Sequence, residues 1–299
     1  LQSRVPGRET RERCSARRRA AGGKDPVDLW FGEQLSRELE ADAPACALDQ
    51  DVAASGKRTE HTLSLKTRAG GHNELRGGMR MQGSQQLADW IRSGETRVLC
   101  GQRIFVHTAV TPGRPPLLLI HGYPTASYDW IRIWPRLAAT HSLYTLDLLG
   151  FGLSDKPRGS HYPIEQQADF CMALLGECGV GVVHVLAHDY GDTVAQELLA
   201  RHAEGRLKVA SMAFLNGGLF PETHRARPIQ KLLATPVLGP LLARAMNYEK
   251  FAAAMLSISG RHPPSREELQ DLWLLAERDG GRLALARLIS YMEQRRRQR

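Results

Sequence analysis

The run Val185–Asp192, VLAHDYGD, decides the fold of this chain. An apolar stretch ends within it and a helical pattern begins, and two small residues, Ala187 and Gly191, lie two positions before and after Asp189. A tight turn from strand to helix tolerates only small residues at those two positions, and it lifts the middle side chain clear of the sheet. The run therefore predicts a nucleophile elbow with Asp189 as its nucleophile, although an aspartate that merely caps a helix is an alternative that the run leaves open.

A second motif lies upstream, where the apolar run Leu117–Ile120 leads into His121, Gly122, Tyr123 and Pro124. A continuous apolar run of this length is typical of a strand that is buried on both faces of a sheet. An HGxP turn alone is a frequent chance match. Such a turn after one strand, followed by small-x-Asp-x-small after a later strand, is much less frequent, so the pair favours the elbow over the helix cap. A carboxylate at an elbow can attack without a base to deprotonate it.

Strands and helices are predicted to alternate around these two motifs. Apolar or alternating runs predict strands over residues 97–100, 103–110, 117–120, 142–148, 182–187 and 207–215, and helices over 127–140, 164–177 and 192–202. This alternation indicates an α/β fold with a mostly parallel sheet that is flanked by helices. From about residue 223 the pattern is helical only. We therefore expect a disordered extension over 1–90, an incomplete core over 91–222 and an all-helical cap over 223–299.

Four longer runs carry a resemblance to a known family: 121–130 (HGYPTASYDW), 149–157 (LGFGLSDKP), 188–198 (HDYGDTVAQEL) and 216–224 (NGGLFPETH). Through them the chain resembles the α/β-hydrolase fold family, in the branch of the epoxide hydrolases and haloalkane dehalogenases. Within that branch it is most similar to hydrolases of the mesoderm-specific transcript type. The resemblance implies an eight-stranded sheet, a helical cap inserted after the sixth strand, and a two-step hydrolysis through an alkyl–enzyme ester.

The resemblance also implies roles for individual residues. The backbone N–H groups of Tyr123 and Tyr190 would form an oxyanion hole beside Asp189. Epoxide hydrolases protonate the leaving oxygen with tyrosines of the cap, and Tyr291 lies where the resemblance places one, with Tyr248 as a weaker candidate. Dehalogenases often carry Trp directly after the nucleophile, so Tyr190 favours an epoxide over a halide substrate.

The order of catalytic residues in this family is nucleophile, acid and then histidine. The histidines that follow Asp189 are His202, His224 and His262, and none of them lies where the catalytic base belongs. We therefore expect the last two strands, the acid and the catalytic histidine to be missing, and the chain as given to be inactive. The preferred function is an epoxide-hydrolase-like enzyme. A haloalkane dehalogenase or other ester-type hydrolase, and a non-catalytic member that binds a small apolar ligand, stay open.

Composition narrows the range of partners. The net charge of +8 lies at the two ends, since residues 1–24 hold eight basic and two acidic residues and residues 295–299 hold four arginines. A nucleic-acid-binding protein needs a basic face on its fold, so a small-molecule substrate is the expected partner, without nucleic acid. The motifs imply no cofactor and no metal. No apolar run approaches ~18 residues, so a membrane partner is not supported; the cytoplasm is the default location, and the oligomeric state stays open.

Overall fold

The structure is a computed structural model, and it describes residues 83–220, 222, 228–235 and 237–297. The chain divides into two compact units, residues 1–77 and 78–299, and every described residue belongs to the second unit. The disordered extension that the sequence predicts therefore lies mostly outside the described residues. None of the helices in the described part has both the length and the apolar character that a membrane crossing requires.

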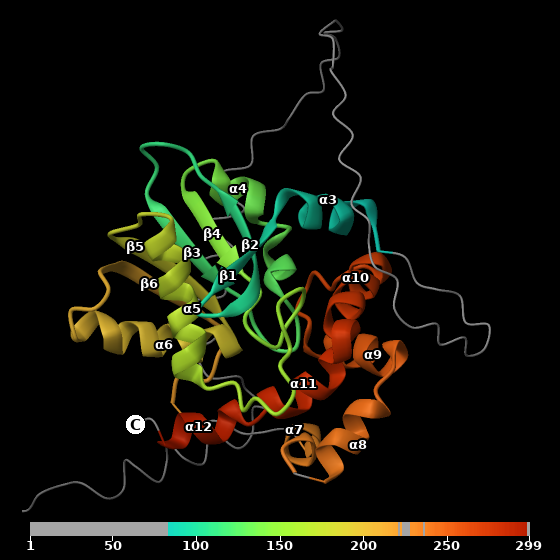
Figure 1. The fold of residues 1–299 in the computed structure, drawn as a ribbon. Coiled ribbons are helices and arrows are strands. Elements are labelled where there is room, and N and C mark those ends of the chain that lie inside the picture. Colours follow the sequence, from blue (N-terminus) through green and yellow to red (C-terminus); the bar gives the residue numbers. More distant parts are fainter. Residues whose placement is uncertain (1–82, 221, 223–227, 236, 298–299) are drawn as a thin grey trace, which may run out of the picture. The chain divides into compact units, whose positions relative to one another are not determined.

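Six strands of the described chain form one sheet in the order β1-β2-β4-β3-β5-β6 (Figure 1). Their bounds are Glu95–Leu99 for β1, Gln102–Ala109 for β2, Pro116–Ile120 for β3, Ser142–Leu146 for β4, Val183–His188 for β5 and Val209–Leu215 for β6. The pairs β1–β2 and β2–β4 are antiparallel, whereas β3–β4, β3–β5 and β5–β6 are parallel. The predicted α/β fold with a mostly parallel sheet is confirmed.

Helices cover both faces of this sheet. The core helices and turns are α3 (Gln85–Ser93), η1 (Ser127–Trp130), α4 (Trp134–Ala138), α5 (Ile164–Glu177) and α6 (Tyr190–Ala203). The later helices are α7 (Pro228–Leu233), α8 (Leu238–Arg244), α9 (Tyr248–Ile258), α10 (Arg266–Glu277), η2 (Arg278–Gly280), α11 (Gly281–Leu288) and α12 (Tyr291–Arg297). Figure 1 shows α7–α12, in orange and red, gathered together to one side of the sheet.

The alternation of side chains along β3 separates two apolar cores. Leu118 and Ile120 point into a cluster that includes residues of α5, α6, α11 and α12. Leu117 and Leu119 point to the other face, where Trp90 of α3 and Trp273 of α10 belong to the same cluster. Both cores also contain residues of the last helices, so the cap shares its apolar packing with the core of the sheet layer.

Helix α3 corrects the predicted boundary of the extension, because residues 85–90 belong to a helix. Ser84 caps it by accepting a hydrogen bond from Leu87 N–H, and it also donates its own N–H and hydroxyl to Asp271 of α10, at 2.8 and 2.5 Å. Tyr128 of η1 donates to the same carboxylate at 3.0 Å. Trp90 stacks on His107 of β2 with ring centroids 4.0 Å apart. The ordered core therefore begins before residue 91.

The predicted helix over 127–140 is wrong in its extent. The structure divides it into η1 and α4, and Pro135 occupies the first turn of α4. Proline has no N–H to donate and its ring clashes with the preceding turn, so it is accepted where a helix begins and not in its interior. Helix α6, in contrast, starts at Tyr190, two residues earlier than predicted.

Candidate active site

Asp189 lies at the turn between β5 and α6, with a left-handed backbone at φ 52° and ψ −109°. A non-glycine residue with positive φ is strained, and such residues concentrate at functional sites. A Cβ on Gly191 would lie 2.7 Å from the carbonyl oxygen of His121 and still closer to that of Ile120, so this position requires glycine. The Asp189 side chain makes no capping hydrogen bond to α6. The turn is a sharp strand-to-helix elbow, and its Asp189 side chain does not act as a helix cap.

The turn that contains Tyr123 lies directly against this elbow. Tyr123 N–H donates a hydrogen bond to Asp189 Oδ2 at 3.0 Å. A Cβ on Gly122 would come within 3.0 Å of Asp189 Cβ and 2.9 Å of His188 Nδ1, so the close approach depends on glycine. The peptide bond between Tyr123 and Pro124 is cis. Parallel pairing of β3 with β5 brings the two turns together, since the carboxyl ends of both strands meet at one edge of the sheet.

Tyr190, the other residue whose backbone N–H is predicted to line the oxyanion hole, is the first residue of α6. Its backbone N–H therefore has no acceptor within the helix. Among the described residues, the hydrogen bond to the Asp189 carboxylate comes from Tyr123 N–H. The side chain of Tyr190 is fully buried, and its ring packs edge-on against Tyr291 with centroids 4.9 Å apart. The structure therefore brings Tyr123, Asp189, Tyr190 and Tyr291 together, and Tyr123 N–H donates to the Asp189 carboxylate.

His121 holds the turn to the strand beside it. Its Nδ1 lies 2.8 Å from the carbonyl oxygen of Gly122, and its Nε2 accepts from Leu148 N–H at 3.0 Å just after β4. This pattern fits a neutral ring with the proton on Nδ1, and burial lowers the pKa of His121 in the same direction. Because both ring nitrogens have partners, His121 positions the turn.

The two candidate tyrosines of the cap lie in different surroundings. Tyr291 at the start of α12 is 3% exposed, and burial together with the nearby charge of Asp189 raises the pKa of its phenol. The guanidinium of Arg295, one turn later, lies over its ring at 6.0 Å. The Tyr248 hydroxyl instead donates to the carbonyl of Arg266 in α10, at 3.4 Å. Tyr291 is thus the candidate that faces the elbow.

Two further carboxyl groups surround Asp189, and sequence reasoning missed both. Burial raises the pKa of Asp129 to about 7, and its carboxyl accepts from the hydroxyl of Thr125. Burial also raises the pKa of Asp192 to about 8, and its Oδ1 accepts from Leu215 N–H at 3.4 Å. The charge of Asp189 adds to both shifts. Asp129 lies in the run 121–130 and Asp192 in the run 188–198, and both runs carry the family resemblance. Membership in these runs was the sequence signal that could have indicated the two aspartates.

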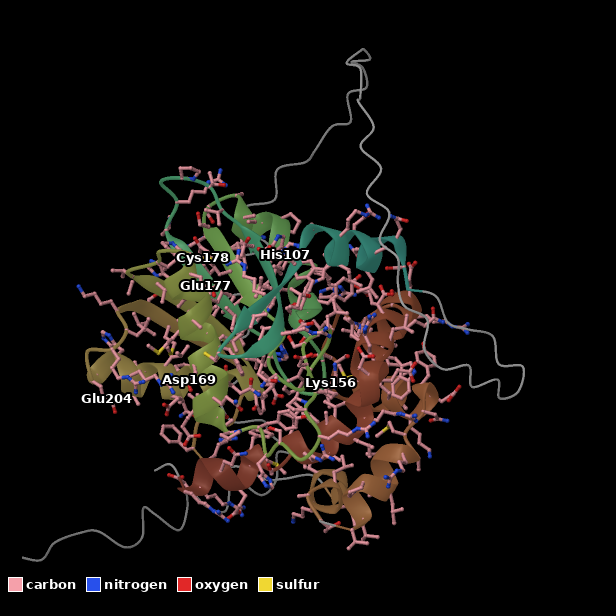
Figure 2. All side chains as sticks on the ribbon, in the orientation of Figure 1. His107, Lys156, Asp169, Glu177, Cys178 and Glu204 are labelled. Carbon is pink, nitrogen blue, oxygen red and sulfur yellow. The ribbon has the colours of Figure 1, made fainter. Side chains whose placement is uncertain are left out.

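The loop after β4, residues 147–157, is held by its own polar groups. Asp147 Oδ1 accepts from Ser127 N–H at 2.8 Å, and its Oδ2 accepts from Leu153 N–H at 2.7 Å. Lys156, labelled in Figure 2, donates to three backbone carbonyls of the same loop, including that of Gly152 at 2.6 Å. These bonds hold the loop in place and give both Asp147 and Lys156 partners within the protein.

The fold and the elbow together define an α/β hydrolase. A family model described as the alpha/beta hydrolase fold matches residues 115–255. The chain is 43% identical over 222 residues to the mesoderm-specific transcript homolog protein of Bos taurus, covering 71% of this chain and 66% of that protein. It is 39% identical to LipZ of Mycobacterium tuberculosis, which is named as a hydrolase, covering 71% of this chain and 74% of that protein. The chain belongs to the α/β-hydrolase fold family.

Solved structures agree on the fold. The epoxide hydrolase VrEH1 from Vigna radiata superposes with a TM-score of 0.55 at 20% identity, over 70% of this chain and 75% of that chain. Haloalkane dehalogenases are also among the structures that superpose. The matched stretch spans just under two thirds of the mesoderm-specific transcript protein, so the activity of the whole relative comes to this chain only as a proposal.

Proposed function

We propose that this chain carries the nucleophile of an epoxide-hydrolase-like enzyme, Asp189, and that Asp189 forms an alkyl–enzyme ester. The observation that supports it is the hydrogen bond from Tyr123 N–H to Asp189 Oδ2. In an ester formed on an aspartate, the oxygen that becomes an oxyanion during hydrolysis is the aspartate's own second oxygen. The donor therefore belongs on the nucleophile even before substrate binds, which is where Tyr123 has it.

The first step is a displacement at an sp3 carbon. Asp189 Oδ1 forms a bond to the epoxide carbon, the ring C–O bond breaks with its electron pair on oxygen, and an acid protonates that oxygen. We assign the acid to Tyr291, which is buried beside the elbow. In the second step the oxygen of water bonds to Asp189 Cγ and the Cγ–Oδ1 bond breaks. Oδ1 leaves as the second hydroxyl of the diol with one proton of the water, and the other proton returns to the Tyr291 phenolate. His121 cannot assist, because both its ring nitrogens are already bonded.

We predict that the ester forms on the purified chain and is hydrolysed slowly. His121 cannot act as a general base in the second step, and such assistance is worth about 10²- to 10⁴-fold. The test is to incubate the purified chain with styrene oxide and follow its intact mass. We expect one added substrate mass, located by peptide mapping on Asp189 and absent from Asp189→Asn. An adduct on another residue, or rapid multiple turnover by this chain, contradicts the proposal.

The same experiment separates the rival functions. A chain that reacts with 1-bromobutane and releases bromide, but leaves styrene oxide unchanged, is a dehalogenase with the same nucleophile. A chain that takes up neither mass, yet keeps its fold by circular dichroism, is a non-catalytic member. Both outcomes retain the family and reject the epoxide as the substrate class.

A further inference from the structure

The helical hairpin α7–α8 exposes apolar side chains on the surface of the cap. Leu232 is 43% exposed, Val237 72%, Leu238 47% and Leu241 55%. In contrast, Ala243 on the inner side of α8 is 4% exposed and faces the cap interior. The hairpin is therefore amphipathic, with one side packed and the other side open. In Figure 1 these two helices lie at the outer edge of the cap.

The charges of the hairpin have one sign. From Pro228 to Tyr248 the chain contains Lys231 and Arg244 but no Asp or Glu. Both cationic residues are exposed, and they lie at the two ends of the apolar stretch. An apolar surface of this kind between cations is typical of a segment that lies in the interface of a bilayer, with its side chains among the lipid tails and its cations at the phosphates.

We propose that the α7–α8 hairpin docks this chain on an anionic lipid surface. Leu232, Val237, Leu238 and Leu241 enter the boundary between headgroups and acyl chains, and the two cations contact lipid phosphates. An exposed cluster of large apolar side chains on a folded protein marks an interaction site, and the absence of acidic residues favours a negatively charged partner. The inference does not depend on the chemistry at Asp189, because the four exposed side chains point away from the helix on which α8 packs, α11.

The test is co-flotation of the full chain with phosphatidylcholine vesicles that contain phosphatidylserine. We expect Val237→Glu/Leu238→Glu to weaken vesicle binding at least about tenfold. The matched control is Val98→Glu/Val182→Glu on the core, whose side chains are 67% and 48% exposed and whose charge change is identical. This control should bind as the wild type does, and circular dichroism should show both variants folded.

The contribution of the two cations to vesicle binding is measured separately. Lys231→Gln and Arg244→Gln should each lower binding by about fivefold on anionic vesicles, and pure phosphatidylcholine vesicles should bind the wild type more weakly. The basic stretch at residues 1–24 could also attract anionic lipid, and binding that Val237→Glu/Leu238→Glu leaves unchanged would assign it there and overturn the proposal. A self-association that this variant abolishes, without vesicle binding by the wild type, would instead identify a second copy as the partner.

Discussion

Tyr123 N–H and Asp189 Oδ2 lie 3.0 Å apart although 66 positions separate the two residues in the sequence. Parallel pairing of β3 with β5 places Ile120 opposite Ala187, and the two turns that follow then face each other. The contact therefore depends on the register of the sheet as well as on the sequence of either turn. Any substitution that pushes the turns apart should remove the donor from the nucleophile.

Gly191→Ala should do this directly. The added methyl group meets the carbonyl oxygens that end β3, which are backbone atoms and cannot turn aside. We expect a loss of about 1–3 kcal/mol in the free energy of unfolding, measured with urea, together with loss of ester formation. Gly176→Ala in α5 is the control, since its Cβ meets nothing within 4 Å, and it should leave stability unchanged or raise it by up to about 1 kcal/mol. Equal effects of the two substitutions would contradict this account.

Trp90→Ala tests whether α3 belongs to the core. Trp90 is 4% exposed and packs against His107 and Trp134. Removing a buried tryptophan should cost about 3–5 kcal/mol in the free energy of unfolding. The neighbouring Ile91 is 36% exposed, so Ile91→Ala should cost less than about 1 kcal/mol. If Trp90→Ala is as mild as its neighbour, α3 is an appendage after all.

Asp192→Asn should change how stability depends on pH. The folded-state pKa of Asp192 is raised to about 8, so between about pH 4 and 8 the folded chain holds a proton that the unfolded chain has lost. Stability then falls as pH rises through this window, by at most about 1.4 kcal/mol per pH unit. The asparagine removes this contribution and keeps an oxygen for Leu215 N–H. Urea denaturation at pH 5 and pH 8 should show a smaller decline for the variant, and an identical decline would reject the assignment.

Tyr291→Phe should distinguish substrates with an epoxide oxygen as leaving group from substrates with a halide as leaving group. An epoxide oxygen needs a proton as it leaves, whereas a halide does not. We expect ester formation with styrene oxide to slow by about 10²- to 10⁴-fold, while reaction with 1-bromobutane stays within a few-fold of the wild type. Tyr248→Phe is the matched control, because its hydroxyl bonds to Arg266 and not to the site. Equal slowing with both substrates would mean that Tyr291 acts through packing.

The sheet could be predicted from the sequence because its central strands are runs of apolar residues, and such runs indicate burial on both faces. Leu117–Ile120 is apolar throughout, and the structure buries it on both faces. Helix α3 could not be predicted in the same way, because it buries only Leu87 and Trp90 and depends on Asp271, which lies 187 residues from Ser84 in the sequence. A local pattern does not contain a partner so distant.

In the candidate site, too, local features could be predicted from the sequence and features that depend on distant residues could not. Small residues at fixed spacing around Asp189 identify the elbow, since the steric demand of a tight turn is local. The burial of Asp129 and Asp192 is a property of the assembled fold, and nothing in the spacing of either residue indicates it. Tyr291 was placed by resemblance, and its approach to the elbow depends on how α12 packs on α6.

The carboxylate of Asp271 joins three segments that are remote in sequence, since it accepts from Ser84 before α3 and from Tyr128 of η1 while belonging to α10. Moving α10 away from the sheet breaks all of these bonds at once. Loss of this one carboxylate would release α3 and η1 from α10 together, so the three remote segments are expected to unfold as one cooperative unit.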